Sequence, residues 1–289
     1  MTRDDVTRDD VTRDDVTRDD VTRDMVKQFL LYLLLDNMAM VVVIVPLVID
    51  AMMKGYRGKD VLEYADPSMS TTLWIYIIGY IITIAVFQKM RYVRLSTGHI
   101  AHSNYWKAAG YAMLIAWAWV ITKIGCLLLV DLFFPGEAEE DSWITENMQY
   151  PLLMFIAGCI LAPISEEIVF RGILVGGLLR MRQKPWVAIV CPALVFALSH
   201  GDYSLLVDHT VFGIICGWLY WRTKSLLPGI LIHIINNSTA FFLMLFGNDF
   251  NVEPSAYFLL LLIVIFLPLL VLGLRWYKRE FAREIVRDR

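Results

Sequence analysis

Charged residues are scarce in this chain of 289 residues: they make up 19% of it, whereas hydrophobic residues make up 57% and the mean hydropathy is +0.55. An ordinary soluble domain is more polar, so this composition excludes one and predicts an all-α polytopic membrane protein. The net charge of −3 is small and implies neither a nucleic-acid partner nor an acidic one. The lipid bilayer is the partner that the composition does imply.

Several short signals are also missing. The four cysteines lie in apolar runs without CxxC spacing, so we expect buried reduced thiols rather than disulfides or a metal cluster. The chain has no HExxH sequence, in which one helical turn supplies two zinc ligands and a base. We expect no cleavable signal peptide, because the first apolar run follows a charged segment and lacks a small-residue cleavage site.

Apolar runs of about 20 residues, the length that crosses a bilayer, recur along the chain. The fifth run is short and is framed by Pro185 and Gly201, so we expect it to end inside the protein. The sequence predicts a bundle of about eight transmembrane helices with a polar intramembrane cavity. The expected spans are about 26–52, 72–88, 105–130, 150–179, 186–200, 204–221, 226–247 and 256–275.

The chain divides into four parts by composition. Residues 2–24 repeat Thr-Arg-Asp-Asp-Val with a period of five, and this charged tract has no apolar face, so we expect a disordered cytosolic tail. The four parts are a low-complexity charged N-terminal tail (1–24), N-terminal transmembrane helices (25–148), a candidate catalytic core (149–247), and a last transmembrane helix with a basic cytosolic tail (248–289).

Lysine and arginine are absent from the loops 135–149 and 248–255, but they are frequent in 180–184, 222–224 and 275–289. Cytoplasmic loops carry the excess of these residues. We therefore expect a multi-pass protein of the cell membrane with both termini in the cytosol.

Ionisable side chains inside the apolar runs are the main exception to this pattern. Glu166, Glu167 and Arg171 lie in an otherwise apolar run from Met154 to Leu179. Each charge at such depth costs at least ~2.5–3.5 kcal/mol, so these groups should face a protein interior or a water-filled cavity. Glu167 and Arg171 are four residues apart, which predicts an ion pair that holds the helix and leaves Glu166 free.

Further polar residues come to the same depth from other spans. At ~1.5 Å per residue, Glu166, His200, His233 and Asn237 all lie ~12–21 Å from the basic ends of their spans. Three spans thus deliver a carboxylate, two imidazoles and an amide to one level of the membrane.

This set has the parts for hydrolysis of a peptide bond by water. A carboxylate removed from bulk water is a stronger base, so Glu166 can activate a water molecule beside a histidine. His233 and Asn237 are four apart on one helical face, where they can donate two hydrogen bonds to a developing oxyanion.

Three other interpretations remain open at this point. Glu166, His200 and His233 match the ligand set of some hydrolytic zinc sites, which makes a divalent metal such as zinc an alternative cofactor. Ser165 and Ser199 are weak nucleophile candidates, because each serine lies on a different helical face from its charged neighbour. The polar residues could also act only as hydrogen bonds between helices.

A few intramembrane polar residues lie outside these motifs. Asp36 and Asn37 in the first span could line a cavity. Lys123 is expected to extend toward the outer interface, as long basic side chains do. Asp208 and His209 are expected at the start of the sixth span.

At the charged and polar motifs the sequence resembles the CPBP family of intramembrane proteases, which includes CAAX prenyl proteases and bacteriocin-processing, abortive-infection-like proteins. The resemblance covers about residues 150–240, and its strength lies in three motifs in one order. These are EExxxR at Glu166–Arg171, FxxxH at Phe196–His200 and HxxxN at His233–Asn237.

The resemblance implies an eight-helix bundle with a water-accessible conical cavity. It assigns the activation of water to Glu166 with His200, and the oxyanion hole to His233 with Asn237. The residues that it implies to be supporting are Glu167, Arg171 and Phe196.

The prediction is therefore an integral-membrane endopeptidase, glutamate-type or metal-dependent, whose site opens toward the cytosol. Its expected substrate is a membrane-embedded or lipidated peptide or protein, such as a prenylated C-terminus, a leader peptide or a small membrane protein. The main alternative is a non-proteolytic membrane scaffold or bacteriocin-immunity protein. A transporter is disfavoured, because the two halves of the chain show no inverted repeat of hydropathy.

Overall fold

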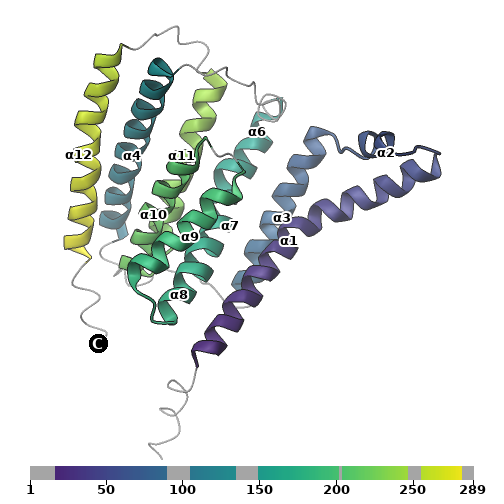
Figure 1. Ribbon diagram of the computed structural model, residues 1–289, viewed down its shortest axis with the longest axis horizontal. Helices are drawn as coiled ribbons and strands as arrows, with labels where there is room; N and C mark the ends of the chain where they lie inside the picture. The colour runs from purple at the N-terminus through teal and green to yellow at the C-terminus, as the bar shows by residue number, and fades with distance from the viewer. Residues whose placement is uncertain (1–16, 90–104, 135–148, 202–203, 247–254, 282–289) are drawn as a thin grey trace, which may run out of the picture.

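The computed structural model describes residues 17–89, 105–134, 149–201, 204–246 and 255–281, and these residues form helices and short connections without a β-strand (Figure 1). The helices before the fourth span are α1 (Arg18–Met53), α2 (Lys59–Tyr64), α3 (Met69–Lys89) and α4 (Tyr105–Phe133). The fourth span consists of α6 (Pro151–Met154), η2 (Phe155–Leu161), α7 (Ala162–Glu166), η3 (Glu167–Val175) and α8 (Gly176–Arg180). The last helices are α9 (Pro185–Ser199), α10 (Leu206–Thr223), α11 (Leu227–Phe246) and α12 (Ala256–Glu280).

Among the described residues, five helices are long and apolar enough to cross a membrane: α3, α4, the composite helix from α6 to α8, α11 and α12. The helix α1, which bends by 41° between Arg18–Leu35 and Met40–Met53, makes a sixth span if both halves belong to one crossing. The predicted all-α, polytopic fold is confirmed. The helix α9 is a shorter apolar helix, as the sequence predicted, and its C-cap is His200.

The packing divides the helices into neighbouring groups (Figure 1). The helix α4 packs against α12 and α11, α9 packs against α10, and α1 packs against α3. The composite helix lies between these groups and contacts α1, α3, α9, α10 and α11. It therefore brings Glu166 and Glu167 next to most of the bundle.

Close approach of α9 and α10 depends on small residues. A Cβ added at Gly213 would lie 2.9 Å from the Cβ of Ala193, and one added at Gly217 would lie 3.2 Å from Ile189. The absence of side chains at these glycines lets the two helices pack closely. This contact fixes the position of His200 at the end of α9 relative to α10.

The described ends of the chain lie at the same end of the bundle in Figure 1, where α1 begins and α12 ends. Two contacts join helix ends there: Lys107 Nζ lies 3.2 Å from Glu280 Oε1, and Arg222 donates to the Lys278 carbonyl at 3.2 Å. The basic end of α12 therefore lies beside the start of α4 and the basic end of α10. The cytosolic location of both termini stays a prediction.

The prediction of a disordered tail over residues 2–24 is wrong for its last part. The helix α1 begins at Arg18, because Thr17 and Asp20 form a capping box in which each side chain accepts from the other residue's backbone N–H. Each complete copy of the repeat Thr-Arg-Asp-Asp-Val contains the same threonine and aspartate three residues apart. Residues 1–16 lie outside the described residues, and the division of the chain at 24, 148 and 247 stays a prediction.

Candidate active site

The carboxylates of the first motif lie where the composite helix changes its hydrogen-bonding pattern. Glu166 is the last residue of the α-helical turn α7, and Glu167 is the first residue of the π-helix η3. Pro163, near the start of α7, has no backbone N–H, so it cannot continue the hydrogen-bond ladder of the preceding π-helix η2. Such π segments within α-helices are frequent at functional sites.

Glu167 and Arg171 form a buried ion pair, as the sequence predicted. Arg171 Nη1 lies 2.7 Å from Glu167 Oε1, and both side chains are nearly inaccessible. The guanidinium also donates to the Gly213 carbonyl at 3.4 Å and lies 4.8 Å from the centre of the Phe196 ring. Arg171 therefore ties η3 to α9 and α10, and it compensates the buried charge of Glu167.

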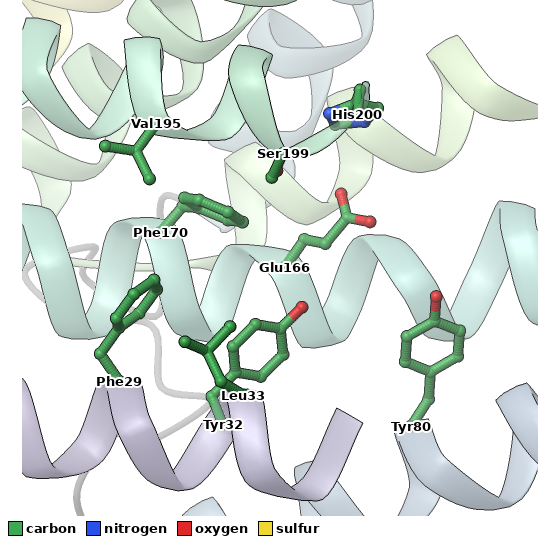
Figure 2. A pocket seen from close by; sticks show the side chains of 9 residues that line it. All are labelled: Phe29, Tyr32, Leu33, Tyr80, Glu166, Phe170, Val195, Ser199 and His200. Atoms are coloured by element: carbon green, nitrogen blue, oxygen red, sulfur yellow. The ribbon is translucent and has the colours of Figure 1, made fainter. Parts of the chain in front are cut away.

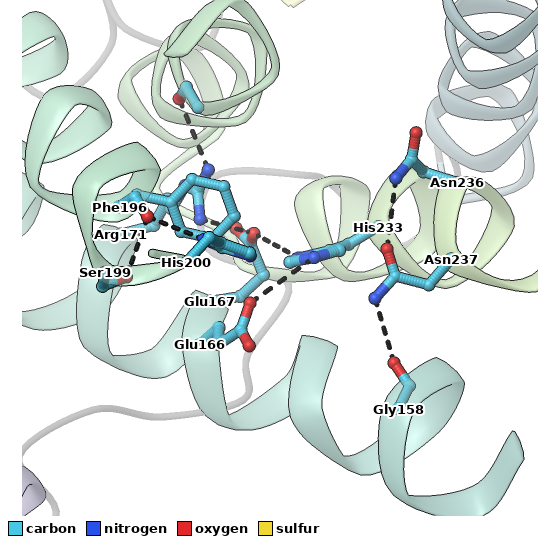
Figure 3. Close-up of polar contacts among 11 residues, drawn as sticks. Gly158, Glu166, Glu167, Arg171, Phe196, Ser199, His200, His233, Asn236 and Asn237 are labelled. Carbon is cyan, nitrogen blue, oxygen red and sulfur yellow. Dashed lines mark hydrogen bonds and ion pairs between the residues drawn. The ribbon is translucent and has the colours of Figure 1, made fainter. Parts of the chain in front are cut away.

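His233 lies between the two glutamates (Figure 3). Its Nδ1 is 3.1 Å from Glu167 Oε1, and its Nε2 is 3.5 Å from Glu166 Oε2. When Nδ1–H donates to Glu167, the Nε2 atom is directed toward Glu166, so Glu167 sets both the tautomer and the orientation of the imidazole. The sequence did not predict this contact, since it assigned Glu167 to Arg171 alone.

A glycine makes room for this arrangement. A Cβ added at Gly229 in α11 would lie 2.6 Å from Glu167 Oε2. The Glu167 carboxylate therefore occupies space that any other residue at position 229 would fill. Oε2 has no hydrogen-bond partner within the described part of the chain, so the carboxylate is held through its other oxygen.

His200 approaches the same region from the exposed end of α9. Its Nδ1 is 2.8 Å from the Phe196 carbonyl, and its ring packs against the Phe196 ring at 4.6 Å. The Phe196 ring also lies 5.8 Å from His233 and 5.1 Å from Phe170. Phe196 thus separates and orients the two histidines, which agrees with its predicted supporting position.

Asn237 is one helical turn beyond His233 on α11. Its amide nitrogen donates to the Gly158 carbonyl at 2.9 Å, and its oxygen accepts from Asn236 at 3.1 Å. The Gly158 carbonyl lies in η2, so this bond joins α11 to the composite helix. An amide group carries two N–H donors, so the bond to Gly158 uses one of them.

A cavity of about 320 Å³ lies beside Glu166. Figure 2 shows the Glu166 side chain directed toward Ser199 and His200, with the side chains of α1 and α3 on the other side of the cavity. The lining residues are Phe29, Tyr32, Leu33, Tyr80, Glu166, Phe170, Val195, Ser199 and His200. The contributions of α1 and α3 could not be found from the sequence, because no motif marks these residues.

The serines that the sequence considered are not activated. Ser199 donates its hydroxyl to the Phe196 carbonyl at 2.8 Å, and Ser165 is fully buried. Neither hydroxyl is directed at a histidine by any contact of the described residues. The geometry gives a seryl mechanism no support.

The metal-dependent alternative needs three ligands around one point. Within the described ranges, no three histidine, cysteine, aspartate or glutamate residues lie so that they could hold a metal ion. Glu166 and His233 are adjacent, but His200 Nδ1 is directed at its own helix and His233 Nδ1 at Glu167. The donor set, as it is arranged, does not fit a three-ligand site, and the mechanism below uses no metal.

One polar position outside the motifs differs from the prediction. Lys123 does not extend toward the outer interface: its Nζ lies 3.2 Å from Asp208 Oδ2 and 3.2 Å from Asn236 Oδ1. Asp208 and His209 lie in the first turn of α10, as predicted, and the side chains of Asp36 and Asn37 lie outside what the structure describes.

Comparison with known proteins finds relatives for the part of the chain that contains the motifs. Residues 148–239 match the family described as type II CAAX prenyl endopeptidase Rce1-like, and this match contains all three motifs. This part of the chain is therefore similar to the CPBP family of membrane proteases. The matched residues form the composite helix, α9, α10 and most of α11, which supply the glutamates, both histidines and Asn237.

Three curated bacterial proteins are similar to this chain. A putative membrane peptidase, YdiL of Bacillus subtilis, is 31% identical over 102 residues, which is 35% of this chain and 41% of that protein. The membrane-embedded CAAX protease MroQ of Staphylococcus aureus is 26% identical over 139 residues, 46% of this chain and 54% of MroQ. The UPF0177 protein YaiH of Lactococcus lactis is 28% identical over 105 residues, 36% of this chain and 43% of YaiH.

The similarity thus spans about half the length of these relatives, or less. No solved structure matches the chain significantly. The comparisons concern this core, and they do not assign an activity to the whole protein.

Proposed function

We propose that this protein is an intramembrane endopeptidase that hydrolyses a peptide bond of a membrane-associated substrate. The observation that carries the proposal is the placement of Glu166 beside a cavity, 3.5 Å from His233, while the neighbouring Glu167 is neutralised by Arg171. A carboxylate that is excluded from bulk solvent, faces a cavity and lies beside an oriented imidazole has the geometry of a general base.

In the proposed reaction, a water molecule binds in the cavity between Glu166 and His200. Glu166 takes one proton from the water, and the oxygen attacks the carbonyl carbon of the scissile bond. The carbonyl π electrons move to the oxygen and form a tetrahedral oxyanion. Glu166 then delivers its proton to the amide nitrogen, the C–N bond breaks, and a carboxylic acid and an amine are released.

His233 and Asn237 are proposed as the donors to the oxyanion. The Asn237 amide has two N–H groups: one donates to the Gly158 carbonyl, and the other is the proposed donor to the oxyanion. His233 can donate from Nε2 once that atom is protonated. Glu166, which lies 3.5 Å from Nε2, lends His233 the proton that it took from water while the oxyanion exists, and takes it back before delivering it to the amide nitrogen. Glu167 accepts from Nδ1 throughout and keeps the ring in place.

The substrate class is proposed as a peptide or protein in or on the bilayer, including a prenylated C-terminus or a leader peptide. The cavity supports this class because its wall opposite Glu166, formed by α1, is aromatic and aliphatic, with Phe29, Tyr32 and Leu33. MroQ bears the name of a membrane-embedded CAAX protease, which agrees with the proposal.

The test compares membrane peptidomes of cells that carry the wild-type protein or Glu166→Gln, which keeps the shape of the side chain and removes the base. We expect specific precursors to accumulate and specific fragments to disappear in the variant. Ser199→Ala is the matched control: it changes another residue of the same cavity and should leave the profile as in wild type. Identical profiles for wild type and Glu166→Gln, with a phenotype for the deletion, would favour a non-proteolytic scaffold or immunity role.

A further inference from the structure

Lys123 is a partly buried cation that the proposed reaction does not use. It lies in α4, and 18% of its side chain is accessible, against 10% for its partner Asp208. Its ammonium group lies 3.2 Å from Asp208 Oδ2 on α10 and 3.2 Å from Asn236 Oδ1 on α11. One side chain of α4 therefore contacts two further helices, at residues that follow it by 85 and 113 positions in the sequence.

The first contact leads to His200. Asp208 is followed by His209, whose ring stacks on the His200 ring with 4.1 Å between centres and 24° between planes. His209 Nδ1 lies 3.0 Å from the Leu205 carbonyl, so the ring is held by its own helical turn. The position of this first turn of α10 therefore determines where the ring beside His200 lies.

The second contact leads to Asn237. Lys123 donates to the Asn236 oxygen, Asn236 donates to the Asn237 oxygen at 3.1 Å, and Asn237 donates to the Gly158 carbonyl at 2.9 Å. Each bond in this row fixes which end of the next amide is the donor. The row therefore orients the Asn237 nitrogen, which the mechanism needs as a donor.

We infer that Lys123 is a positioning residue that fixes where His200 and Asn237 lie relative to each other. It acts on His200 through Asp208 and His209, and on Asn237 through Asn236. This inference rests on the proposed function for its catalytic consequence, while the positions of His200 and Asn237 can be tested without it. Lys123 is absent from the residues that line the cavity, so it acts through its neighbours rather than on the substrate.

A purely structural role makes a different prediction. A buried ion pair can often be replaced by uncharged residues at little cost in stability, whereas removal of one partner alone strongly destabilises the protein. The double variant Lys123→Met/Asp208→Asn removes both charges and should fold. If the pair served only stability, this variant would keep full activity. If Lys123 positions the site, the variant stays folded but its catalysis is impaired.

The experiment measures kcat and KM of purified protein in vesicles of defined lipid, with a substrate found by the peptidome comparison. For Lys123→Met/Asp208→Asn we expect kcat to fall by up to about 100-fold, as misplacement of about 1 Å can cause, with little change in KM. Lys123→Arg, which keeps a charged donor, should retain much of the rate. Lys107→Met is the matched control, because it removes an exposed ion pair of the same helix, with Glu280.

A second readout does not depend on activity. Diethyl pyrocarbonate modifies accessible imidazoles, and mass spectrometry resolves the modified histidines among the five of the chain. In the double variant we expect faster modification of His200, because the ring of His209 no longer covers it in a fixed position. An unchanged rate at His200, or a wild-type kcat in a folded double variant, overturns the inference. If wild-type protein cleaves nothing, the proposed function fails, and the modification rate alone decides the role of Lys123.

Discussion

Replacing Arg171 with methionine is expected to destabilise the protein severely. Methionine keeps much of the apolar packing against Phe196, but it leaves the carboxylate of Glu167 buried without its cation. Removal of one partner of a buried pair costs about 3–5 kcal/mol, which lowers the ratio of folded to unfolded protein by roughly two to three and a half powers of ten.

The assay is the abundance of the variant in membranes, together with the temperature at which the detergent-solubilised protein aggregates. Both values should fall sharply for Arg171→Met. The double variant Glu167→Gln/Arg171→Met, which removes both charges, should recover much of the stability but not the orientation of His233. Lys107→Met serves as the control, since an exposed pair contributes about 0–1 kcal/mol. Wild-type abundance and thermal stability of Arg171→Met would show that the buried carboxylate of Glu167 does not need its cation.

Three further predictions concern the surroundings of the site. Gly229→Ala places a methyl group 2.6 Å from Glu167 Oε2, so we expect kcat to fall about 10- to 100-fold while the protein stays in the membrane; unchanged kinetics would contradict this. Gly213→Leu forces α10 away from Ala193 and should lower both stability and cleavage, measured by thermal aggregation and turnover. Prolonged treatment with a metal chelator should leave turnover unchanged, and a loss that zinc restores would instead support the metal-dependent alternative.

The positions of the helices could be predicted well from hydropathy alone. The predicted span 186–200 corresponds to Pro185–Ser199, and the predicted span 150–179 corresponds to the composite helix Pro151–Arg180. Proline and glycine at the ends of the fifth run gave its boundaries, since each interrupts helical hydrogen bonding. The start of α1 was missed because the repeat has no apolar periodicity, although its Thr17–Asp20 capping pair was present in the sequence.

The π-helices η2 and η3 could not be predicted. A π turn differs from an α turn in which carbonyl accepts each N–H, and this choice depends on packing rather than on a local pattern of residue types. The sequence therefore placed Glu166 and Glu167 on adjacent faces of a regular α-helix, and it gave no reason to expect Glu167 to contact His233.

Contacts between residues of different helices could not be predicted from the sequence either. The ordered motifs identified the glutamates, the histidines and Asn237, because rare polar residues stand out in apolar runs. The partner of Lys123 depends on which helices are neighbours, and a single residue in one span carries no such information. Its charge was therefore assigned to the membrane surface, whereas Asp208 compensates it inside the protein.

The central claim is that Glu166 is the base of a proteolytic site, and one measurement tests it most directly. The rate of cleavage of a single identified substrate is compared for purified wild-type protein and purified Glu166→Gln in the same lipid vesicles. We expect the variant to be folded and inserted and to bind the substrate, but to show no cleavage above the background without enzyme. Cleavage by Glu166→Gln at the wild-type rate would show that Glu166 is not the base.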